Sequence, residues 1–365
     1  MSTINLKNES MPPVDLVMSI LDQPVIQKPE EPEERVKIAI IMDYDDTITV
    51  RYSQEQMVEK NIENIKKFYK EHHNIMVETA ADYWNIVTEL YKGGSKEVSY
   101  LSCLMRDFEN GVITGRSGEK MKVDDLLYYG SLSPLAPGIK DFLKEIKKEH
   151  DVDLRIYVVS VGMKNLIMGS GIGDLVDGVY SCELKQSFKD YVDTIHRVVV
   201  SFSKSEEYIR IVKGVLPDNE DVLNKRLTQD EYFLQYDHTI IVGDGMSDKP
   251  LFMFAGKKGA KRIAVYSPGN RYSFKKCVSE LITDGAIDAL VPRDYTPGGQ
   301  TFRLFSDMIS AMARAGEGCG FPPYLLYQYR KGILCSSEVI DFVKSHISTC
   351  PNCTDHTDVA IIYPR

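Results

Sequence analysis

The chain has 365 residues, of which 43% are hydrophobic, and a formal net charge of −9. This length is sufficient for a sizeable core and an accessory domain, and the negative charge disfavours a general binder of nucleic acids or anionic membranes. No apolar run approaches the roughly 18 residues of a membrane-spanning helix, and no secretory signal is evident, so we expect a cytoplasmic protein without a membrane partner.

Residues 1–35 are expected to form a tail or linker. They include Pro12-Pro13 and a stretch over 28–34 that consists mainly of proline and glutamate. Such a composition buries too little apolar surface to offset the cost of ordering the chain.

The first informative motif is an apolar run, Ile38 to Met42, that ends in Asp43 and is followed by Asp45 and Thr47. Continuous hydrophobicity is typical of a parallel strand that is covered on both faces. Residues two apart in an extended segment point to the same side, so Asp43 and Asp45 are predicted to face one site. Two carboxylates in one site need a cation or a proton. The pattern therefore indicates metal-assisted chemistry, with one aspartate as nucleophile and the other as acid/base.

The next stretch, residues 53–129, is too long for an ordinary connection between a strand and a helix. Apolar residues such as Met57, Ile62 and Ile65 recur in it at helical intervals, which predicts a mostly helical insertion. Solvated helix faces and core packing are the ordinary roles of its long side chains. Its candidates for substrate contact are Trp84, Arg106, Arg116 and Lys120.

A second buried-type strand is predicted over 154–160, ending in the hydroxyl of Ser160, and shorter strands are predicted over 177–181 and 196–200. A helix is then predicted to begin near Lys204. A lysine close to a helix N-terminus is well placed to neutralise an anion.

Two questions about this helix stay open at the level of sequence. Either Ser203 or Ser205 is suited to cap it. Lys185 and Lys213 are alternatives to Lys204 as the anion-binding cation.

A third strand, Thr239 to Val242, ends in Gly243-Asp244, and Asp248 follows four residues later. Hard cations such as Mg²⁺ prefer oxygen ligands, usually one or two carboxylates with waters and substrate phosphate. Asp43, Asp244 and Asp248, with backbone oxygens, would supply enough. Further core strands are predicted over 262–266 and 286–291.

Residues 301–365 form a C-terminal extension that is predicted to be partly helical, with no role that can be assigned. The chain has seven scattered cysteines, which favours a reducing compartment over a disulfide framework. Although the unusually compact spacing and the absence of a second Cys-x-x-Cys favour a loop with incidental thiols, four residues near the C-terminus are candidate zinc ligands. They are His346, Cys350, Cys353 and His356.

The order of these motifs, Asp-x-Asp-x-Thr, strand-Ser, Lys and Gly-Asp-x-x-x-Asp, resembles that of the haloacid dehalogenase (HAD) superfamily over residues 36–297. The resemblance implies an α/β fold with a Rossmann-like parallel sheet flanked by helices. It implies a catalytic core made of residues 36–52 and 130–300, and a helical cap of the C1 type over residues 53–129 that closes over the site and selects the substrate.

The resemblance also implies roles for individual residues. Asp43 would attack phosphorus and form an aspartyl-phosphate. Asp45 would protonate the leaving alcohol and then deprotonate water. Ser160 and Lys204 would bind the phosphoryl group. A Mg²⁺ cofactor would be held by Asp43, Asp45 (through its carbonyl), Asp244 and Asp248.

Two departures or distinctions within the family bear on the activity. Members that cleave carbon–halogen bonds lack the second aspartate, and ion-pumping ATPases carry threonine there, so Asp45 points to phosphatases and phosphomutases. Asp46 stands where glycine is common, and its carboxylate is expected either to raise the local negative potential or to point away into the cap. Lys249-Pro250 after Asp248 is a further departure.

We therefore expect a Mg²⁺-dependent phosphatase that hydrolyses a phosphate monoester of a small molecule. A phosphomutase or phosphotransferase is the closest alternative, because it shares both aspartates. A non-catalytic binding protein with the same fold is the alternative from a different class. The sequence does not identify the substrate or the oligomeric state.

Overall fold

The computed structural model describes residues 35–90, 92, 94–215, 223–228, 231–314, 329 and 337–349. Residues 1–34 of the predicted tail lie outside this range. So do Cys350, Cys353 and His356, three of the four candidate zinc ligands.

The fold is built on a seven-stranded sheet with the order β4-β3-β2-β1-β5-β6-β7. All neighbouring strands are parallel except β3 and β4, which are antiparallel. The predicted α/β fold with a Rossmann-like parallel sheet is therefore confirmed. The strands are β1 (Lys37–Met42), β2 (Asp153–Met163), β3 (Gly178–Lys185), β4 (Thr194–Arg197), β5 (Thr239–Gly243), β6 (Lys261–Tyr266) and β7 (Ala289–Pro292).

The central strand β1 lies between β2 and β5, with Ile40 opposite Ile156 on one side and Ile240 on the other. The pairing continues one residue beyond the strand, because the backbone N–H of Asp43 donates to the carbonyl of Val242 at 2.8 Å. Asp43 is thus fixed at the carboxyl edge of the sheet, where open α/β folds bind their ligands.

Alternating side chains of β1 serve two different hydrophobic clusters, as expected for a strand covered on both faces. Ile38, Ile40 and Met42 pack with α7 (Ile139–Glu149) and α12 (Gln300–Arg314). Ala39 and Ile41 belong to the cluster on the opposite face, to which three other helices contribute. These are α9 (Lys204–Lys213), α10 (Lys249–Gly256) and α11 (Arg271–Cys277).

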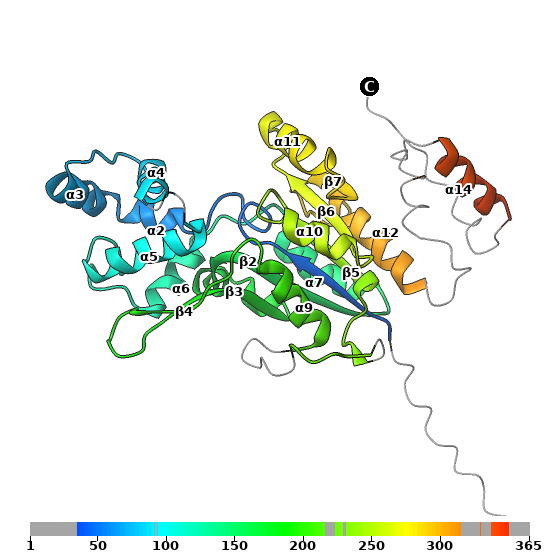
Figure 1. Cartoon of the computed structure of the whole chain (residues 1–365), viewed down its shortest axis with the longest axis horizontal. Helices are drawn as coiled ribbons and strands as arrows, with labels where there is room; N and C mark the ends of the chain where they lie inside the picture. The colour runs from blue at the N-terminus through cyan, green and yellow to red at the C-terminus, as the bar shows by residue number, and fades with distance from the viewer. Residues whose placement is uncertain are drawn as a thin grey trace, which may run out of the picture. The chain divides into compact units, whose positions relative to one another are not determined.

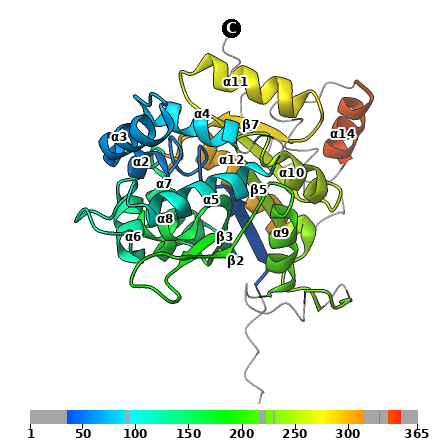
Figure 2. The same cartoon turned by 60° about the vertical axis from the view of Figure 1, so that its left-hand side comes forward.

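Between β1 and β2 the chain forms the predicted helical insertion, whose helices gather as one group in both Figure 1 and Figure 2. They have their own hydrophobic cluster, which extends to Met163 at the end of β2 and to Cys182 and Leu184 of β3. The insertion is therefore anchored on the sheet through buried apolar contacts. Its helices are α2 (Glu55–Lys60), α3 (Ile62–His73), α4 (Ala80–Leu90), α5 (Lys96–Glu109) and α6 (Val123–Ser131).

The remaining described helices are short or lie late in the chain. They are α8 (Lys164–Gly169), the 3₁₀ turns η1 (Gly173–Leu175) and η3 (Tyr236–His238), the π-helical turn η4 (Val278–Ile282), and α14 (Ser337–Thr349). Among the helices that the structure describes, none combines the length and the apolar character that a membrane crossing requires.

Several predicted boundaries were wrong. β2 does not end at Ser160 but continues to Met163, beyond a register shift against β3 at this point. The strand predicted over 196–200 is shifted to Thr194–Arg197, where it pairs antiparallel with β3. Pairing between neighbouring strands, which no local pattern reports, sets these ends.

The start of α9 also differs from the prediction. Ser203 occupies the N-cap position, but its side chain makes no capping bond to the helix. Its hydroxyl instead bonds the backbone of Val200, accepting from the N–H at 2.9 Å and donating to the carbonyl at 3.1 Å. The Ser203 hydroxyl therefore stabilises the turn that precedes Lys204 and not the first turn of the helix.

Candidate active site

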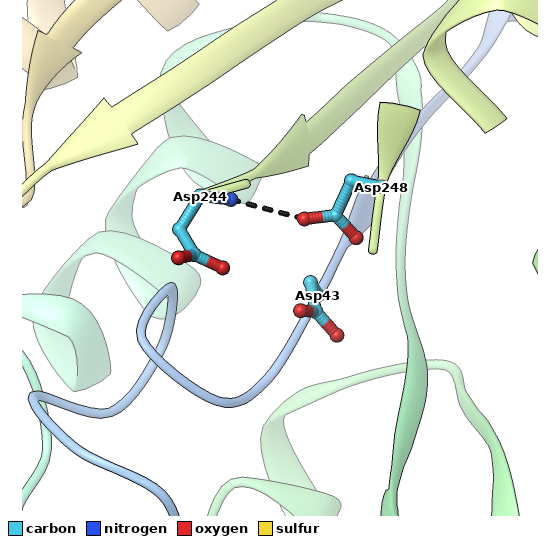
Figure 3. Close-up of side chains that lie close together, drawn as sticks. All are labelled: Asp43, Asp244 and Asp248. Carbon is cyan, nitrogen blue, oxygen red and sulfur yellow. Dashed lines mark hydrogen bonds between the residues drawn. The ribbon is translucent and has the colours of Figure 1, made fainter. Parts of the chain in front are cut away.

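Three predicted site residues meet at the carboxyl edge of the sheet, as Figure 3 shows. Asp43, Asp244 and Asp248 each offer one carboxylate oxygen, and these oxygens all lie within 4.8 Å of one another. Asp43 follows β1, Asp244 follows β5, and Asp248 directly precedes α10. Because β1 and β5 are adjacent and parallel, their carboxyl ends place the first two side chains next to each other.

The carboxylate of Asp248 closes the turn after β5. Its Oδ2 accepts from the backbone N–H of Asp244 at 3.1 Å, as drawn in Figure 3, and from that of Gly245 at 3.4 Å. A Cβ atom at Gly243 would lie 2.3 Å from this same oxygen, so the turn requires glycine there. These contacts direct Oδ1 of Asp248 toward the other site residues.

Lys204 forms ion pairs with two of these carboxylates. Its Nζ lies 2.6 Å from Oδ1 of Asp248, to which it donates a hydrogen bond, and 2.9 Å from Oδ1 of Asp43. The side chain is fully buried. The two alternative lysines lie elsewhere, since Lys213 donates to the carbonyls of Leu223 and Lys225, and Lys185 pairs with Glu183.

Burial makes this cluster electrostatically costly without a further cation. Desolvation, and next the charge of Asp248, raise the pKa of Asp43 to about 6 although Lys204 opposes the shift. Desolvation and the neighbouring carboxylates also raise the pKa of Asp244 well above its ordinary value. Burial lowers the pKa of Lys204, but Asp248 and Asp43 outweigh it and the net shift is upward.

These residues fit a magnesium ion. The donors are all carboxylate oxygens, which suit a hard cation. Oδ1 of Asp43 is buried and lies 2.9 Å from the Lys204 ammonium, with which it forms an ion pair. Both oxygens of Asp248 already accept hydrogen bonds, so Asp43 and Asp244 are better placed to give the ion an oxygen directly.

Asp45 lies beside this cluster in a different environment. It is 6% exposed, and its Oδ1 accepts from the backbone N–H of Ser53 at 2.7 Å. Desolvation raises the pKa of its carboxyl to about 7, against the opposing effect of the Ser53 bond. A carboxyl whose pKa lies near neutrality is suited to give and take a proton.

Ser160 is buried within β2, and its Oγ accepts from the backbone N–H of Gly162 at 3.0 Å. A Cβ atom at Gly162 would lie 3.0 Å from Oδ2 of Asp45 and 3.3 Å from Oγ of Ser160. Because Gly162 has no side chain, there is room for the Asp45 carboxylate and the Ser160 hydroxyl beside it.

Further residues hold this site through contacts that the sequence pattern did not indicate. Asp46 does not point into the insertion, because its carboxylate pairs with Arg293 at 2.8 Å. Tyr100 of α5 donates its hydroxyl hydrogen to the carbonyl of Val161 at 2.5 Å, next to Ser160. Nothing in the sequence distinguishes Tyr100 as the residue that makes such a contact. For Asp46 a signal existed, because a charged residue stands at a position that favours glycine.

The four candidate substrate contacts of the insertion have partners or surroundings of their own. Arg106 donates to Asp107, Arg116 pairs with Asp125, and Lys120 stacks over Tyr191. Trp84 packs against Tyr83. These contacts agree with the ordinary structural roles of such side chains.

A second contact joins the insertion to the site. Glu97, in the first turn of α5, accepts from both the backbone N–H and the hydroxyl of Ser201, at 3.3 and 2.8 Å. Ser201 lies three residues before Lys204. The insertion thus contacts the chain beside two of the predicted phosphate-binding residues.

Comparisons with known proteins give distant similarities. No family model matches the chain. An uncharacterized protein of Borreliella burgdorferi is 21% identical over 287 residues, which are 74% of this chain and 96% of that protein. A HAD family hydrolase from Salmonella enterica subsp. enterica serovar Typhi is similar in structure, with 16% identity, coverage of 75% of this chain and 72% of that one, and a TM-score of 0.40.

A cytosolic 5′-nucleotidase IIIB, bound to cytidine, is similar with 15% identity and a TM-score of 0.43, over 76% of this chain and 87% of that one. At such scores these similarities carry no conclusion about the activity of this chain. The chemistry of the site follows instead from the contacts among its residues.

Proposed function

We propose that this chain is a phosphatase of the HAD superfamily, which hydrolyses a phosphate monoester of a small molecule through an aspartyl-phosphate on Asp43 with Mg²⁺ as cofactor. The observation that carries the proposal is the constellation of Asp43, Lys204, Asp244 and Asp248 at one edge of the sheet, with Asp45 beside it. A carboxylate cluster with one buried ammonium is suited to an anionic, oxygen-rich group.

In the first step an oxygen of Asp43 attacks phosphorus, a new O–P bond forms, and the bond to the leaving alcohol breaks. Asp45 gives its proton to the departing oxygen, which leaves as a neutral alcohol. The raised pKa of Asp45, about 7, favours the protonated form that this step needs.

In the second step Asp45, now a carboxylate, takes a proton from water as the water oxygen attacks phosphorus. The bond between phosphorus and Asp43 breaks, and inorganic phosphate leaves. Lys204 balances negative charge on Asp43 and on the phosphoryl oxygens throughout. Magnesium bound by Asp43, Asp244 and Asp248 would supply the further positive charge that a phosphoryl group requires.

The helical insertion is proposed to act as a cap that excludes water and selects the substrate. Its contacts through Tyr100 to Val161 and through Glu97 to Ser201 support this, since they hold α5 beside the predicted phosphate-binding residues. A cap of this kind favours small substrates over bulky ones.

The test is phosphate release from a panel of sugar, nucleotide, amino-acid and aryl phosphates, measured with Mg²⁺ and with chelator. We expect Mg²⁺-dependent release that is abolished in Asp43→Asn and retained in Asp141→Asn, an exposed aspartate of α7. Trapped enzyme should carry phosphate on the peptide that contains Asp43. A folded wild-type protein that releases no phosphate from any substrate would contradict the proposal and favour a mutase or a binding protein.

A further inference from the structure

The loop that follows Asp45 has an unusual backbone at Asp46. Its φ angle is 56°, in the left-handed region that L residues with a side chain seldom adopt. Glycine takes this conformation without steric cost, and aspartate tolerates it better than most residues do. Within the loop the N–H of Asp46 donates to Oγ1 of Thr49 at 3.2 Å. A charged residue at this position suggests a partner that compensates for the strain.

That partner is Arg293, which follows β7 and is 5% exposed. Its Nη1 donates to both the carbonyl oxygen and the Oδ1 of Asp46, at 2.6 and 2.8 Å. Its Nη2 donates to the carbonyl of Val50 at 3.2 Å and to Oγ of Ser267 at 3.3 Å. One guanidinium, which follows β7, therefore binds the loop at two points, Asp46 and Val50, which lie 247 and 243 residues before it in sequence.

The same loop is fixed at two further places. The hydroxyl of Tyr295, which is fully buried, donates to the carbonyl of Thr47 at 3.1 Å. The N–H of Ser53 donates to Oδ1 of Asp45 at 2.7 Å. Asp45 thus lies between strand β1, which is hydrogen-bonded on both edges, and a loop that the segment after β7 holds.

We propose that Arg293 is a positioning residue, whose bonds to Asp46 and Val50 hold the loop so that Asp45 is aimed at the leaving-group oxygen. The inference rests on the proposed phosphatase function and adds to it a residue outside its four motifs. A planar guanidinium is required because it donates in fixed directions to several acceptors at once, which an ammonium group does not do.

The consequence is specific to the leaving group. Only a poor leaving group needs a proton from Asp45 for its departure, and a misplaced general acid should slow only such a reaction. 4-Nitrophenyl phosphate releases a stable phenolate. Benzyl phosphate, of similar size, releases an alkoxide unless its leaving oxygen is protonated. The kcat/KM of each substrate reports the step up to departure, so the ratio of the two values measures how well Asp45 is placed.

The experiment compares Arg293→Lys with the wild type, and Asp45→Asn serves as the reference for a lost acid. We expect Arg293→Lys to lower kcat/KM for benzyl phosphate about 10- to 100-fold, within the range that general acids and small misplacements contribute. The loss should lie in kcat with KM little changed. For 4-nitrophenyl phosphate the loss in kcat/KM should be about threefold or less.

The matched control is Arg262→Lys. Arg262 also bonds a carboxylate with two nitrogens, through Nε and Nη2 to Asp288 at 3.0 and 2.6 Å, but it lies near the start of β6, away from the carboxyl edge of the sheet. This variant should leave the ratio between the two substrates unchanged. A second test variant, Asp46→Gly, removes the carboxylate that Arg293 binds. Glycine adopts φ 56° without strain, so this variant should fold and reproduce part of the loss that is specific to benzyl phosphate.

Equal losses on both substrates, or none, in folded Arg293→Lys and Asp46→Gly would overturn the positioning role, provided that Asp45→Asn shows the selective loss. Wild-type protein that releases no phosphate from these two esters or from the substrate panel would overturn the phosphatase function together with this inference. Thermal unfolding of each variant establishes that it is folded.

Discussion

Lys204 and Asp248 form a buried ion pair, with 2.6 Å between Nζ and Oδ1 and no more than 2% of either side chain exposed. The same ammonium lies 2.9 Å from Asp43. The pair joins helix α9 to the turn after β5 in the interior of the protein. Removing one member of such a pair leaves an uncompensated buried charge.

We therefore expect Lys204→Met to destabilise the metal-free protein by about 3 kcal/mol, because Asp43 and Asp248 lose their cation. Urea unfolding in the presence of chelator measures the change. Lys213→Met, in the last turn of the same helix, should cost much less. Equal unfolding midpoints for Lys204→Met and the wild type would show that the pair contributes no net stability.

Asp45 is expected to make stability depend on pH. Its folded pKa is raised from 3.8 to about 7, so the folded state prefers the protonated form. The contribution of Asp45 to stability is fully present below pH 3.8 and is lost as the pH rises through 7. In chelator, Asp45→Asn should therefore gain stability relative to the wild type between pH 5 and pH 8. A difference between the two proteins that does not change with pH would contradict the raised pKa.

Magnesium should stabilise the fold, because it relieves the repulsion among the three clustered aspartates. At a concentration 100-fold above its dissociation constant, an ion that binds only the folded state adds about 2.7 kcal/mol. Thermal unfolding with MgCl₂, against NaCl at the same ionic strength, should show a higher Tm for the wild type. Asp244→Ala should lose most of this increase. An unchanged Tm at millimolar magnesium would argue against a metal site here.

Gly162→Ala should impair catalysis more than stability. The new methyl group would lie 3.0 Å from Oδ2 of Asp45 and 3.3 Å from Oγ of Ser160, so both groups would have to move. We expect kcat/KM to fall at least about tenfold with a small change in Tm, as misplacement near reacting groups costs rate. Steady-state kinetics and thermal unfolding measure the two effects.

The control for this substitution is Gly178→Ala at the start of β3. Its methyl group would meet Tyr180 and Tyr157 at 3.2 and 3.3 Å, which is a comparable crowding on the same sheet but among apolar rings. Activity should persist in this variant. Similar losses of activity in both variants would mean that crowding of the sheet, and not the displacement of Asp45, is responsible.

The central sheet and the carboxylate cluster could be predicted because each strand and the aspartate that follows it are marked by a local sequence pattern. A continuous apolar run followed by Asp43 or Asp244 specifies a buried strand and the group at its end, and adjacent parallel strands bring such ends together. Lys204 could be chosen over Lys213 and Lys185 only through its place in the order of motifs.

Arg293 could not be predicted in this way, because Asp46 and Val50, the loop residues that it binds, lie more than 240 residues away and its segment has no distinguishing pattern. The end of β2 was misjudged for a related reason, since its last residues pair with β3 beyond a register shift. In both cases a long-range contact, and not the local sequence, determines the outcome.

The place of β1 at the middle of the sheet has a consequence for how this chain is made. β1 is synthesised first, but its neighbour β5 begins at Thr239, so one edge of β1 stays unpaired while most of the sheet is still being translated. That edge belongs to Lys37–Met42, a six-residue segment with a single charge and five apolar residues, the kind of sequence that associates with other strands when exposed. Newly made chains that stop before β5 are therefore those we expect to aggregate.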